Sequence, residues 1–368
     1  MPLVTIMSNG KSAGRTVLSG VPLGVWARLF PADMLALCYH MVSDQPLPYF
    51  NYYPFKTSEQ FDADVAFMRE SFPAITYAEM VHRRKNNVRG GGNNFIFTFD
   101  DGFAACHDVI RPILQKYQLD GVFFVTTALV DNRELFFESK VSLCLDAFQR
   151  MTPDGVEDLA AKLGVRGGEQ LTPSAAARLT NNRMENFNMV LPQSASTRPL
   201  LVRLLSLDEQ DQDAINELCE RCDVDPVAML REQRPYMTSN QIRAMADAGF
   251  TIGAHGVAHR RLQSMSRREV ESDIVESCDR VRYLTDQKKV PFAFPYSGHG
   301  LDRGFLADLM RRHDFIELYF DTGGIRRDAA FVVNRVVVDR PSQMTEVRSN
   351  LPGLLQASWA RRRAWIAR

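Results

Sequence analysis

Several features that define whole classes of protein are scarce in this chain. Its six cysteines are scattered over 368 residues, so we expect no disulfide framework and a reducing compartment. Lysine plus arginine equals aspartate plus glutamate at 44 each, so no overall charge attracts nucleic acid. No apolar run approaches the roughly 18 residues that span a bilayer, and the first residues lack the apolar core of a secretion signal. These absences favour a cytoplasmic protein without a nucleic-acid partner or a transmembrane segment.

Short apolar runs alternate with helical patterns along most of the chain. The runs are rich in Phe, Val and Ile and mostly lack strict alternation, as strands buried on both faces do. Capping boxes that begin at Thr57 and Ser266 mark the start of two amphipathic helices between them. The alternation predicts an α/β fold with a parallel sheet, either open or closed into a barrel. The expected strands are residues 34–39, 95–99, 121–127, 250–254, 290–294, 315–320 and 331–338.

Residues 132–236 interrupt this alternation. The stretch is long, largely helical in pattern and broken by polar segments, so we interpret it as a helical insertion rather than a loop. The chain then divides into an α/β domain, residues 1–131 and 237–368, and the insertion between its two parts. The insertion either covers the site and selects the substrate, or it is a structural appendage or a contact in a homodimer. The pattern leaves both readings open.

Polar side chains gather where four of the expected strands end. In parallel α/β folds, chemistry lies just beyond the C-terminal ends of the strands. If the four strands share one sheet, their ends meet at one rim, and the polar groups meet with them. These groups are His40, the run Asp100-Asp101-Gly102, the run from His255 to His259, and Pro295-Tyr296.

The aspartate pair and the histidine pair together suggest a metal site. Asp-Gly is a common turn dipeptide, but carboxylates that end a buried strand are costly without a partner. A metal ion supplies that partner: one aspartate can ligate the ion while the other serves as a base for water. His255 and His259 stand at i and i+4, a spacing that lets two imidazoles bind one ion. Two histidines and one carboxylate leave coordination positions open, as catalytic metal sites do.

With these motifs the chain resembles the polysaccharide deacetylase family, also called carbohydrate esterase family 4. The resemblance covers roughly residues 34–130 and 237–340 and does not account for the insertion. Gly256 stands where the family usually has Ser or Thr. The matching segments are TFDDG at 98–102, HGVAH at 255–259, FPY at 294–296 and the opening YHMV at 39–42.

The resemblance implies a fold, a metal and a set of roles. The fold would be a distorted (β/α) barrel of about seven strands. Asp101, His255 and His259 would hold a divalent ion, commonly zinc. Asp100 would be the general base, and the backbone N–H of Tyr296 would donate to the oxyanion. The reaction would be hydrolysis of an N-acyl group, usually an N-acetyl group on an amino sugar.

Two parts of the family pattern are missing from this chain. The segment around Ala293 lacks the arginine that orients the catalytic aspartate in many members. Arg335 is our candidate replacement, and the alternative is a surface arginine at a strand end. No histidine follows His313, so the C-terminal Leu-x-His motif that supplies the usual general acid is absent. His40 is our candidate for that acid.

Three functions remain open on the sequence. The first is deacetylation of an amino-sugar-containing molecule, such as a glycan precursor, a glycolipid or a sugar nucleotide. The second is amide hydrolysis on a non-sugar metabolite at the same metal site. The third is ligand binding without turnover, which the missing arginine and histidine keep open. The basic segment 361–368 is either a solvated helix end or a peripheral contact to anionic lipid or a substrate phosphate.

Overall fold

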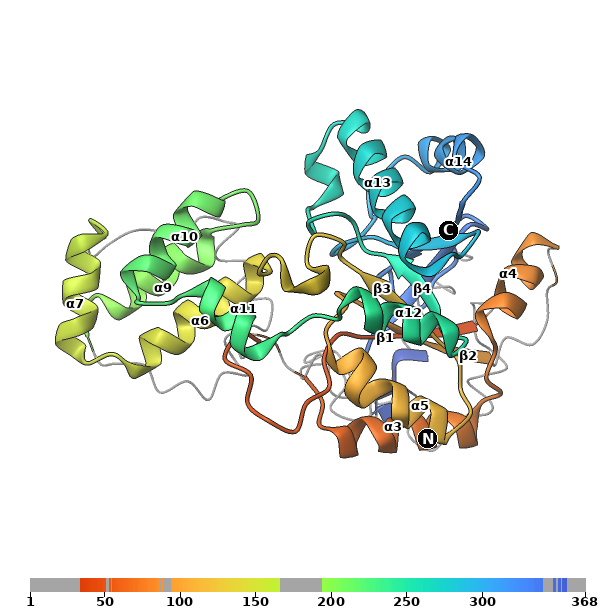
Figure 1. Cartoon of the computed structure of the whole chain (residues 1–368), viewed down its shortest axis with the longest axis horizontal. Helices are drawn as coiled ribbons and strands as arrows, with labels where there is room; N and C mark the ends of the chain where they lie inside the picture. Colours follow the sequence, from red (N-terminus) through yellow and green to blue (C-terminus); the bar gives the residue numbers. More distant parts are fainter. Residues whose placement is uncertain are drawn as a thin grey trace, which may run out of the picture.

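A closed barrel of seven parallel strands forms the centre of the molecule (Figure 1). The computed structural model describes residues 34–50, 53, 55–86, 88, 94–165, 194–339, 347, 348, 350, 351 and 353–355. The strands pair in sequence order, and the last pairs with the first, which confirms the predicted α/β barrel. Every expected strand is present, with small shifts at its ends. The strands are β1 (Met34–Tyr39), β2 (Asn94–Phe99), β3 (Gly121–Val125), β4 (Thr251–Ala254), β5 (Val290–Ala293), β6 (Ile316–Asp321) and β7 (Val332–Val337).

Helices surround this barrel, as the alternating pattern predicts. The capping boxes expected at Thr57 and Ser266 are both formed, and Thr238 forms a third. A π-helical turn, η1 (Cys106–Ile110), precedes the short α5. The helices around the barrel are α3 (Ser58–Ser71), α4 (Tyr77–Lys85), α5 (Arg111–Lys116), α12 (Ser239–Asp247), α13 (Arg267–Thr285) and α14 (Arg303–Arg312).

The interior of the barrel changes from apolar to polar along the strands. Side chains of a strand point alternately inward and outward. Outward-facing residues such as Leu37 and Phe97 pack with the helices in one large cluster. The inward-facing ones form a separate apolar cluster with Tyr77 and Met80 of α4. Towards the C-terminal ends, the same inward positions carry buried polar side chains, namely Cys38, Thr98, Asp100 and Arg335.

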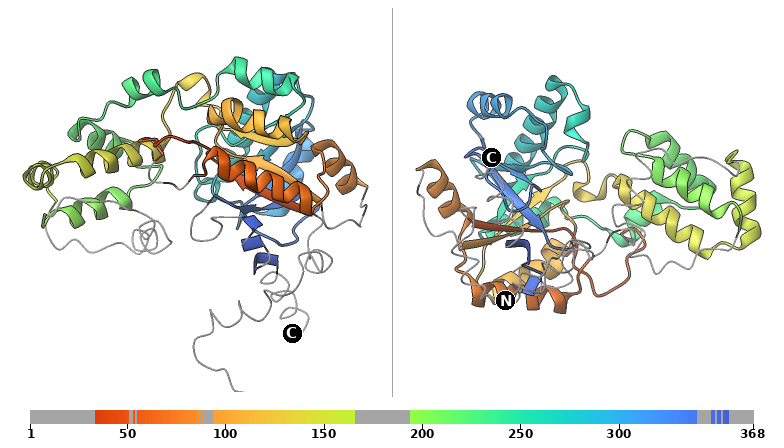
Figure 2. Two further views of the ribbon diagram at one scale, coloured as in Figure 1. Left: turned by 90° about the horizontal axis from the view of Figure 1, so that it is seen from below. Right: turned by 180° about the vertical axis from the view of Figure 1, so that it is seen from behind.

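The described parts of residues 132–236 are helices joined by short loops, and residues 166–193 lie outside the description. The helices pack around a core of their own and lie to one side of the barrel (Figures 1 and 2). Asn132 and Tyr236 join the two ends: the Asn132 amide donates to the Tyr236 carbonyl (3.0 Å), and the Tyr236 N–H donates to the Asn132 side chain (2.9 Å). The division into two units stays a prediction. The helices are α6 (Phe137–Arg150), α7 (Pro153–Lys162), α9 (Thr197–Ser206), α10 (Gln212–Arg221) and α11 (Pro226–Gln233).

The two expectations about membranes concern different parts of the chain. No helix in the described ranges is long and apolar enough to cross a bilayer. The basic segment 361–368, for which a contact to anionic lipid was left open, lies outside the described residues.

Gly253 in β4 is a position where the barrel tolerates no side chain. A Cβ there would lie 2.4 Å from a ring carbon of Phe124 and 2.8 Å from the Pro291 carbonyl oxygen. We expect Gly253→Ala to lower the free energy of unfolding by about 1–3 kcal/mol through overpacking. Urea unfolding checks this, with Gly353→Ala as the control because a Cβ there meets nothing within 4 Å. Equal unfolding midpoints for the two variants would contradict the close packing of β4.

Candidate active site

The polar groups expected at the strand ends meet at one rim of the barrel. Backbone hydrogen bonds continue the sheet one residue beyond the strands and hold these groups in place. The Asp100 N–H donates to the Tyr39 carbonyl (3.0 Å), and the His255 N–H donates to the Val125 carbonyl (2.9 Å). The positions of the aspartate pair and the first histidine are therefore fixed by the barrel itself.

Asp101, His255 and His259 point their ligand atoms at one another. Asp101 Oδ1 lies 3.5 Å from His255 Nε2 and 3.5 Å from His259 Nε2. Four tetrahedral ligand atoms about 2.0–2.1 Å from a zinc ion would lie roughly 3.3 Å apart, close to this spacing. Asp101 Oδ1 is buried and has no hydrogen-bond partner among the residues that the structure describes. A buried, unpartnered carboxylate oxygen facing two imidazoles fits a divalent cation.

The electrostatics of this triad also suit a cation. Burial lowers the pKa of His255 to about 4 and holds the pKa of His259 well below its usual range, so both rings are neutral ligands. His255 Nδ1 lies 2.9 Å from the Ala293 carbonyl, which can only accept, so Nδ1 carries the proton and Nε2 keeps its lone pair. Burial, together with the neighbouring Asp100, raises the pKa of Asp101 to about 7. Among the described residues, Asp101 Oδ1 therefore lacks a cation as a direct partner.

Three residues of the site have left-handed backbones. The φ angles are 72° for Asp101, 52° for His259 and 58° for Tyr296. Such conformations are costly for residues other than glycine, and they persist only where the surrounding structure imposes them. Strain of this kind concentrates at functional sites, and here it aims the side chains of Asp101 and His259 and the peptide group of Tyr296.

Asp100 forms a buried ion pair with Arg335. The guanidinium donates to both carboxylate oxygens, at 2.6 and 2.8 Å, and lies over the rings of Phe124 and Phe320 inside the barrel. Arg335 has no exposed surface, which excludes the alternative of a surface arginine at a strand end. Burial alone would raise the pKa of Asp100, but Arg335 outweighs it and holds that pKa well below its usual range. Asp100 is thus an ionised carboxylate in a fixed orientation.

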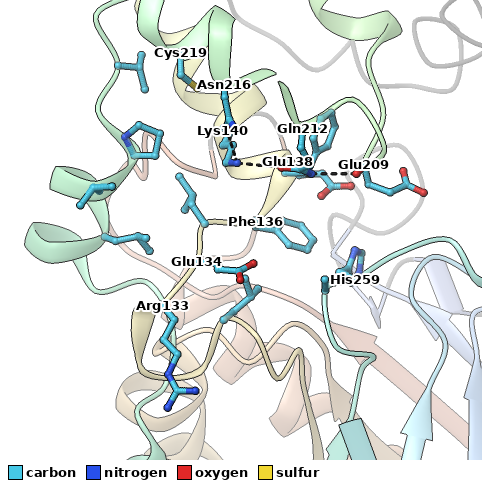
Figure 3. Close-up of a pocket in the computed structure, with 18 of the residues that line it drawn as sticks. Arg133, Glu134, Phe136, Glu138, Lys140, Glu209, Gln212, Asn216, Cys219 and His259 are labelled. Carbon is cyan, nitrogen blue, oxygen red and sulfur yellow. Dashed lines mark hydrogen bonds between the residues drawn. The ribbon is translucent and has the colours of Figure 1, made fainter. Parts of the chain in front are cut away.

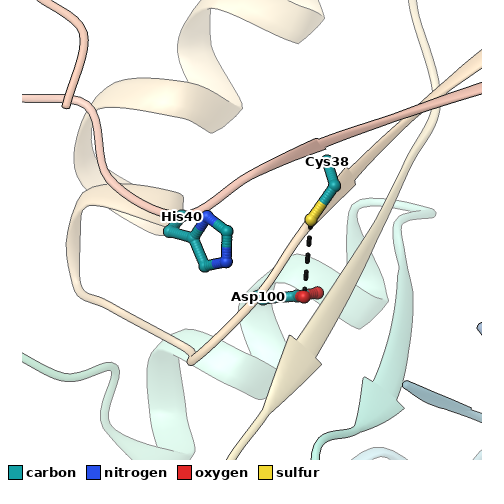
Figure 4. A group of neighbouring side chains, drawn as sticks. All are labelled: Cys38, His40 and Asp100. Atoms are coloured by element: carbon teal, nitrogen blue, oxygen red, sulfur yellow. Dashed lines mark hydrogen bonds between the residues drawn. The ribbon is translucent and has the colours of Figure 1, made fainter. Parts of the chain in front are cut away.

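His40 lies beside Asp100 and forms a pair with a second buried carboxylate, Asp339. Both the His40 N–H (2.6 Å) and its ring Nδ1 (2.9 Å) bond to Asp339 Oδ2. Burial would lower the pKa of His40, but the Asp339 charge outweighs it and raises the pKa to about 9. A ring nitrogen of His40 lies within 4.8 Å of Asp100 and Cys38 (Figure 4). His40 is therefore an imidazolium at neutral pH, close to the ionised Asp100.

Cys38, His40 and Asp100 also have the residue types of a second metal site. The Cys38 thiol donates to Asp100 Oδ2 (3.4 Å), and burial raises the pKa of that thiol well above its usual range (Figure 4). Arg335 already bonds both oxygens of Asp100 and places a positive charge beside the group. A protonated thiol and a fixed guanidinium indicate that this group holds the Asp100 carboxylate in place and does not bind an ion.

The local structure explains why position 256 has a glycine in place of the usual Ser or Thr. Its φ is +75°, and a Cβ there would lie 2.8 Å from Asp273 Oδ1. The buried Asp273 carboxylate of α13 instead accepts a hydrogen bond from the Val257 N–H (3.3 Å). A carboxylate from a neighbouring helix thus supports the turn between the two histidines, and a side chain at position 256 would displace it.

One family model matches a part of the chain that contributes to this site. Residues 209–308 match the family model described as polysaccharide deacetylase, and this segment contains His255, His259 and Tyr296. This part of the chain is similar to the polysaccharide deacetylase family. The match confirms the resemblance that the motifs indicate. None of the curated proteins compared with the chain matches it.

Solved structures resemble this chain at low sequence identity. Streptococcus pyogenes deacetylase PplD, solved in complex with acetate, is 15% identical with a TM-score of 0.52, over 88% of this chain and 99% of that one. IcaB from Ammonifex degensii is 15% identical with a TM-score of 0.49, over 89% and 98%. The barrel architecture of this chain is therefore shared with PplD.

A large cavity opens beside His259 between the barrel and the helical insertion (Figure 3). Its volume is about 930 Å³, at the upper end of the range for small-molecule sites. Apolar residues, with Phe136 central among the labelled side chains, share its wall with polar ones. Its charged residues are the cations Arg133, Lys140 and Arg260 and the carboxylates Glu134, Glu138, Glu209, Glu220 and Asp225.

Sequence reasoning found most of this site but missed Asp339, Cys38 and Glu138. Asp339 directly follows the strand expected at residues 331–338, so the strand-end rule that selected His40 could have found it. Cys38 is an inward position of β1, which an apolar run without strict alternation does not reveal. Glu138 lies in the first turn of α6, and the Tyr296 hydroxyl donates to its carboxylate. Nothing in the helical pattern indicates which surface it faces.

The pair Asp100–Arg335 predicts a strong non-additive effect on stability. We expect Arg335→Met to lower the free energy of unfolding by about 3–5 kcal/mol, because it leaves a buried carboxylate without its cation. Adding Asp100→Asn should recover part of that loss, since the remaining side chain is neutral. Chemical denaturation of the two single variants and the double variant measures the coupling. A double variant whose loss equals the sum of the single losses would contradict the ion pair.

Proposed function

We propose that this chain is a metal-dependent hydrolase that removes an N-acyl group, an N-acetyl group in the first instance, from an amino-sugar-containing substrate. The observation that carries the proposal is the convergence of Asp101, His255 and His259 beside the separately fixed Asp100. That arrangement combines an open metal site with an adjacent base, which are the two components that amide hydrolysis requires.

Asp101 Oδ1 and the Nε2 atoms of His255 and His259 would hold the ion, and two nitrogens with one oxygen suit zinc. A divalent ion bound there would polarise the acyl carbonyl and make water more acidic. The ligands come from the ends of β2 and β4, so the barrel holds the site before any ion binds. Coordination positions left open by three protein ligands would take water and substrate.

Asp100 is the proposed base. Its Oδ2 lies 3.7 Å from His255 Nε2, so it borders the ligand triad, and Arg335 and Cys38 fix its plane. The carboxylate takes a proton from the attacking water as the new C–O bond forms. Its position supports this role more than its basicity does, because Arg335 lowers its pKa.

The Tyr296 N–H is the proposed donor to the carbonyl oxygen as negative charge develops on it. Tyr296 follows β5 at the same rim, and its ring lies 4.6 Å from the ring of His259. A donor fixed where charge develops is worth about 2.7–4 kcal/mol in other acyl-transfer sites. The left-handed φ of Tyr296 orients this peptide group.

His40 is the proposed acid. An amine leaves poorly as an anion, so the C–N bond breaks only if the nitrogen receives a proton. His40 carries that proton at neutral pH because Asp339 raises its pKa to about 9. Its ring is close enough to Asp100 to serve the same reacting bond. His40 and Arg335 thus offer the two groups whose absence from the motifs kept the reading of an inactive relative open.

The cavity supports a substrate larger than a single amino sugar. Its wall mixes carboxylates and amides with the ring of Phe136, a combination that suits hydroxyl groups and the apolar face of a sugar (Figure 3). Five carboxylates against three cations give no net positive charge, which disfavours a nucleotide or other phosphate in this cavity. The substrate we propose is therefore a glycan-type molecule in preference to a sugar nucleotide.

Acetate release from a panel of N-acetylated mono- and oligosaccharides and non-sugar amides tests the proposal. We expect release from sugars by the zinc-loaded protein and a loss of about 10² to 10⁴ in kcat for Asp100→Asn, which keeps its metal. Asp101→Asn should lose bound metal, as metal analysis would show. Release only from non-sugar amides would favour the second function, and bound metal without release from any amide would favour a binding protein.

The His40–Asp339 pair predicts the alkaline limb of the pH profile. An acid acts in its protonated form, so kcat/KM should hold below about pH 9 and fall as the pH rises through that value. Asp339→Asn removes the charge that raises the pKa of His40, so the limb should move to lower pH. His82→Ala, on the distant helix α4, is the control and should leave the profile unchanged. An Asp339→Asn variant with an unmoved limb would assign the acid to another group.

A further inference from the structure

The helical insertion reaches the candidate site at three contacts. The ring of Phe136 lies 4.5 Å from the ring of His259 (Figure 3). The Tyr296 hydroxyl donates to the carboxylate of Glu138. Glu209, between α9 and α10, accepts from the Arg261 N–H (3.1 Å). These contacts come from two parts of the insertion that are far apart in sequence.

Tyr296 is held from the barrel and from the insertion at once. On the barrel side, the Thr322 hydroxyl donates to the Tyr296 carbonyl (2.6 Å). On the insertion side, Glu138 binds the hydroxyl at the other end of the residue. The Arg261 guanidinium lies 3.6 Å from the ring centroid. One contact thus holds the backbone carbonyl of Tyr296 and the other holds its side-chain hydroxyl. Together they maintain the left-handed φ of 58°.

The two carboxylates of the insertion are buried, so each needs a partner that compensates its charge. Glu138 is 7% exposed and Glu209 is 9% exposed. A buried carboxylate is costly unless a donor or cation compensates it. Glu138 receives the Tyr296 hydroxyl, and Glu209 Oε2 lies 3.4 Å from the Arg261 Nε, the cation that covers Tyr296. Both insertion carboxylates therefore act on the same barrel residue, one directly and one through Arg261.

We propose that Glu138 is a positioning residue that orients the Tyr296 N–H, and that the insertion is thereby a working part of the active site. The inference rests on the proposed function, in which that N–H donates to the oxyanion. Without the carboxylate, the phenol loses its fixed partner and the strained peptide group can relax towards commoner φ values. A donor displaced in this way stabilises the transition state less while substrate binding in the cavity is retained.

The test compares Glu138→Ala, Glu138→Gln, Tyr296→Phe and the double variant Glu138→Ala/Tyr296→Phe. Glutamine keeps an oxygen that accepts from the phenol, and phenylalanine keeps the ring and the N–H. Asp158→Ala is the matched control, because this exposed acid on α7 pairs only with Lys162 of the same helix in the described structure. Circular dichroism and thermal unfolding check that α6 stays folded.

We expect Glu138→Ala and Tyr296→Phe each to lower kcat by about ten- to a hundredfold, with KM within about twofold. The double variant should be no worse than the poorer single variant, because both changes remove one hydrogen bond. Glu138→Gln should stay within about threefold of the native protein. A Glu138→Ala variant with native kcat, losses that multiply in the double variant, or a glutamine variant as poor as the alanine one would overturn the proposal.

Hydrogen exchange of the segment 294–300 gives a readout that does not depend on turnover. We expect faster exchange there in Glu138→Ala and Tyr296→Phe, and native exchange in Glu138→Gln and Asp158→Ala. Unchanged exchange in Glu138→Ala would overturn the positioning role. If the native protein hydrolyses no amide, the proposed function fails, and the exchange rates still decide whether the insertion holds Tyr296.

Discussion

The ion pair between Asp100 and Arg335 is the constraint on which the rest of the site depends. A carboxylate at the inner mouth of a closed barrel is out of reach of bulk water, so it needs a cation there. Arg335 comes from β7 and Asp100 from the end of β2, with β1 between them, so the pair fixes the register across three strands. The two hydrogen bonds set the plane of the Asp100 carboxylate and lower its pKa. For a base that is already oriented, the better position offsets the weaker basicity.

The two adjacent aspartates show how one motif yields two roles. Asp100 points into the barrel, where Arg335 keeps it ionised. Asp101, one residue on and in a left-handed conformation, points at two neutral histidines, and its pKa is raised to about 7. The charge that Asp100 requires is built into the chain, whereas the charge that Asp101 requires has to be bound. Environments that separate the pKa values of neighbouring acids assign their functions.

The sequence predicts the barrel and its rim well because both follow from short-range patterns. Apolar runs locate the strands, and polar residues at their ends locate Asp100, His255 and Tyr296. Arg335 and His40 could be named as replacements because they too lie on or beyond strands, and Asp339 was within reach of the same rule. Glu138 and Phe136 could not be found in this way, since a helical pattern identifies an apolar face but not the surface that the face contacts. The division of the chain at residues 132 and 236 stays a prediction.

The strained backbone of Tyr296 needs contacts that hold it, which gives the insertion a physical reason to lie close to this rim. A residue held at φ 58° relaxes unless contacts on both sides prevent it, and the barrel supplies only one side of Tyr296. The barrel fold shared with PplD therefore does not determine the reactivity of the rim by itself. The segment that holds the phenol also forms a wall of the cavity beside His259. A substrate filling that cavity would press on the same helix that orients Tyr296, so recognition and oxyanion stabilisation would depend on one set of contacts.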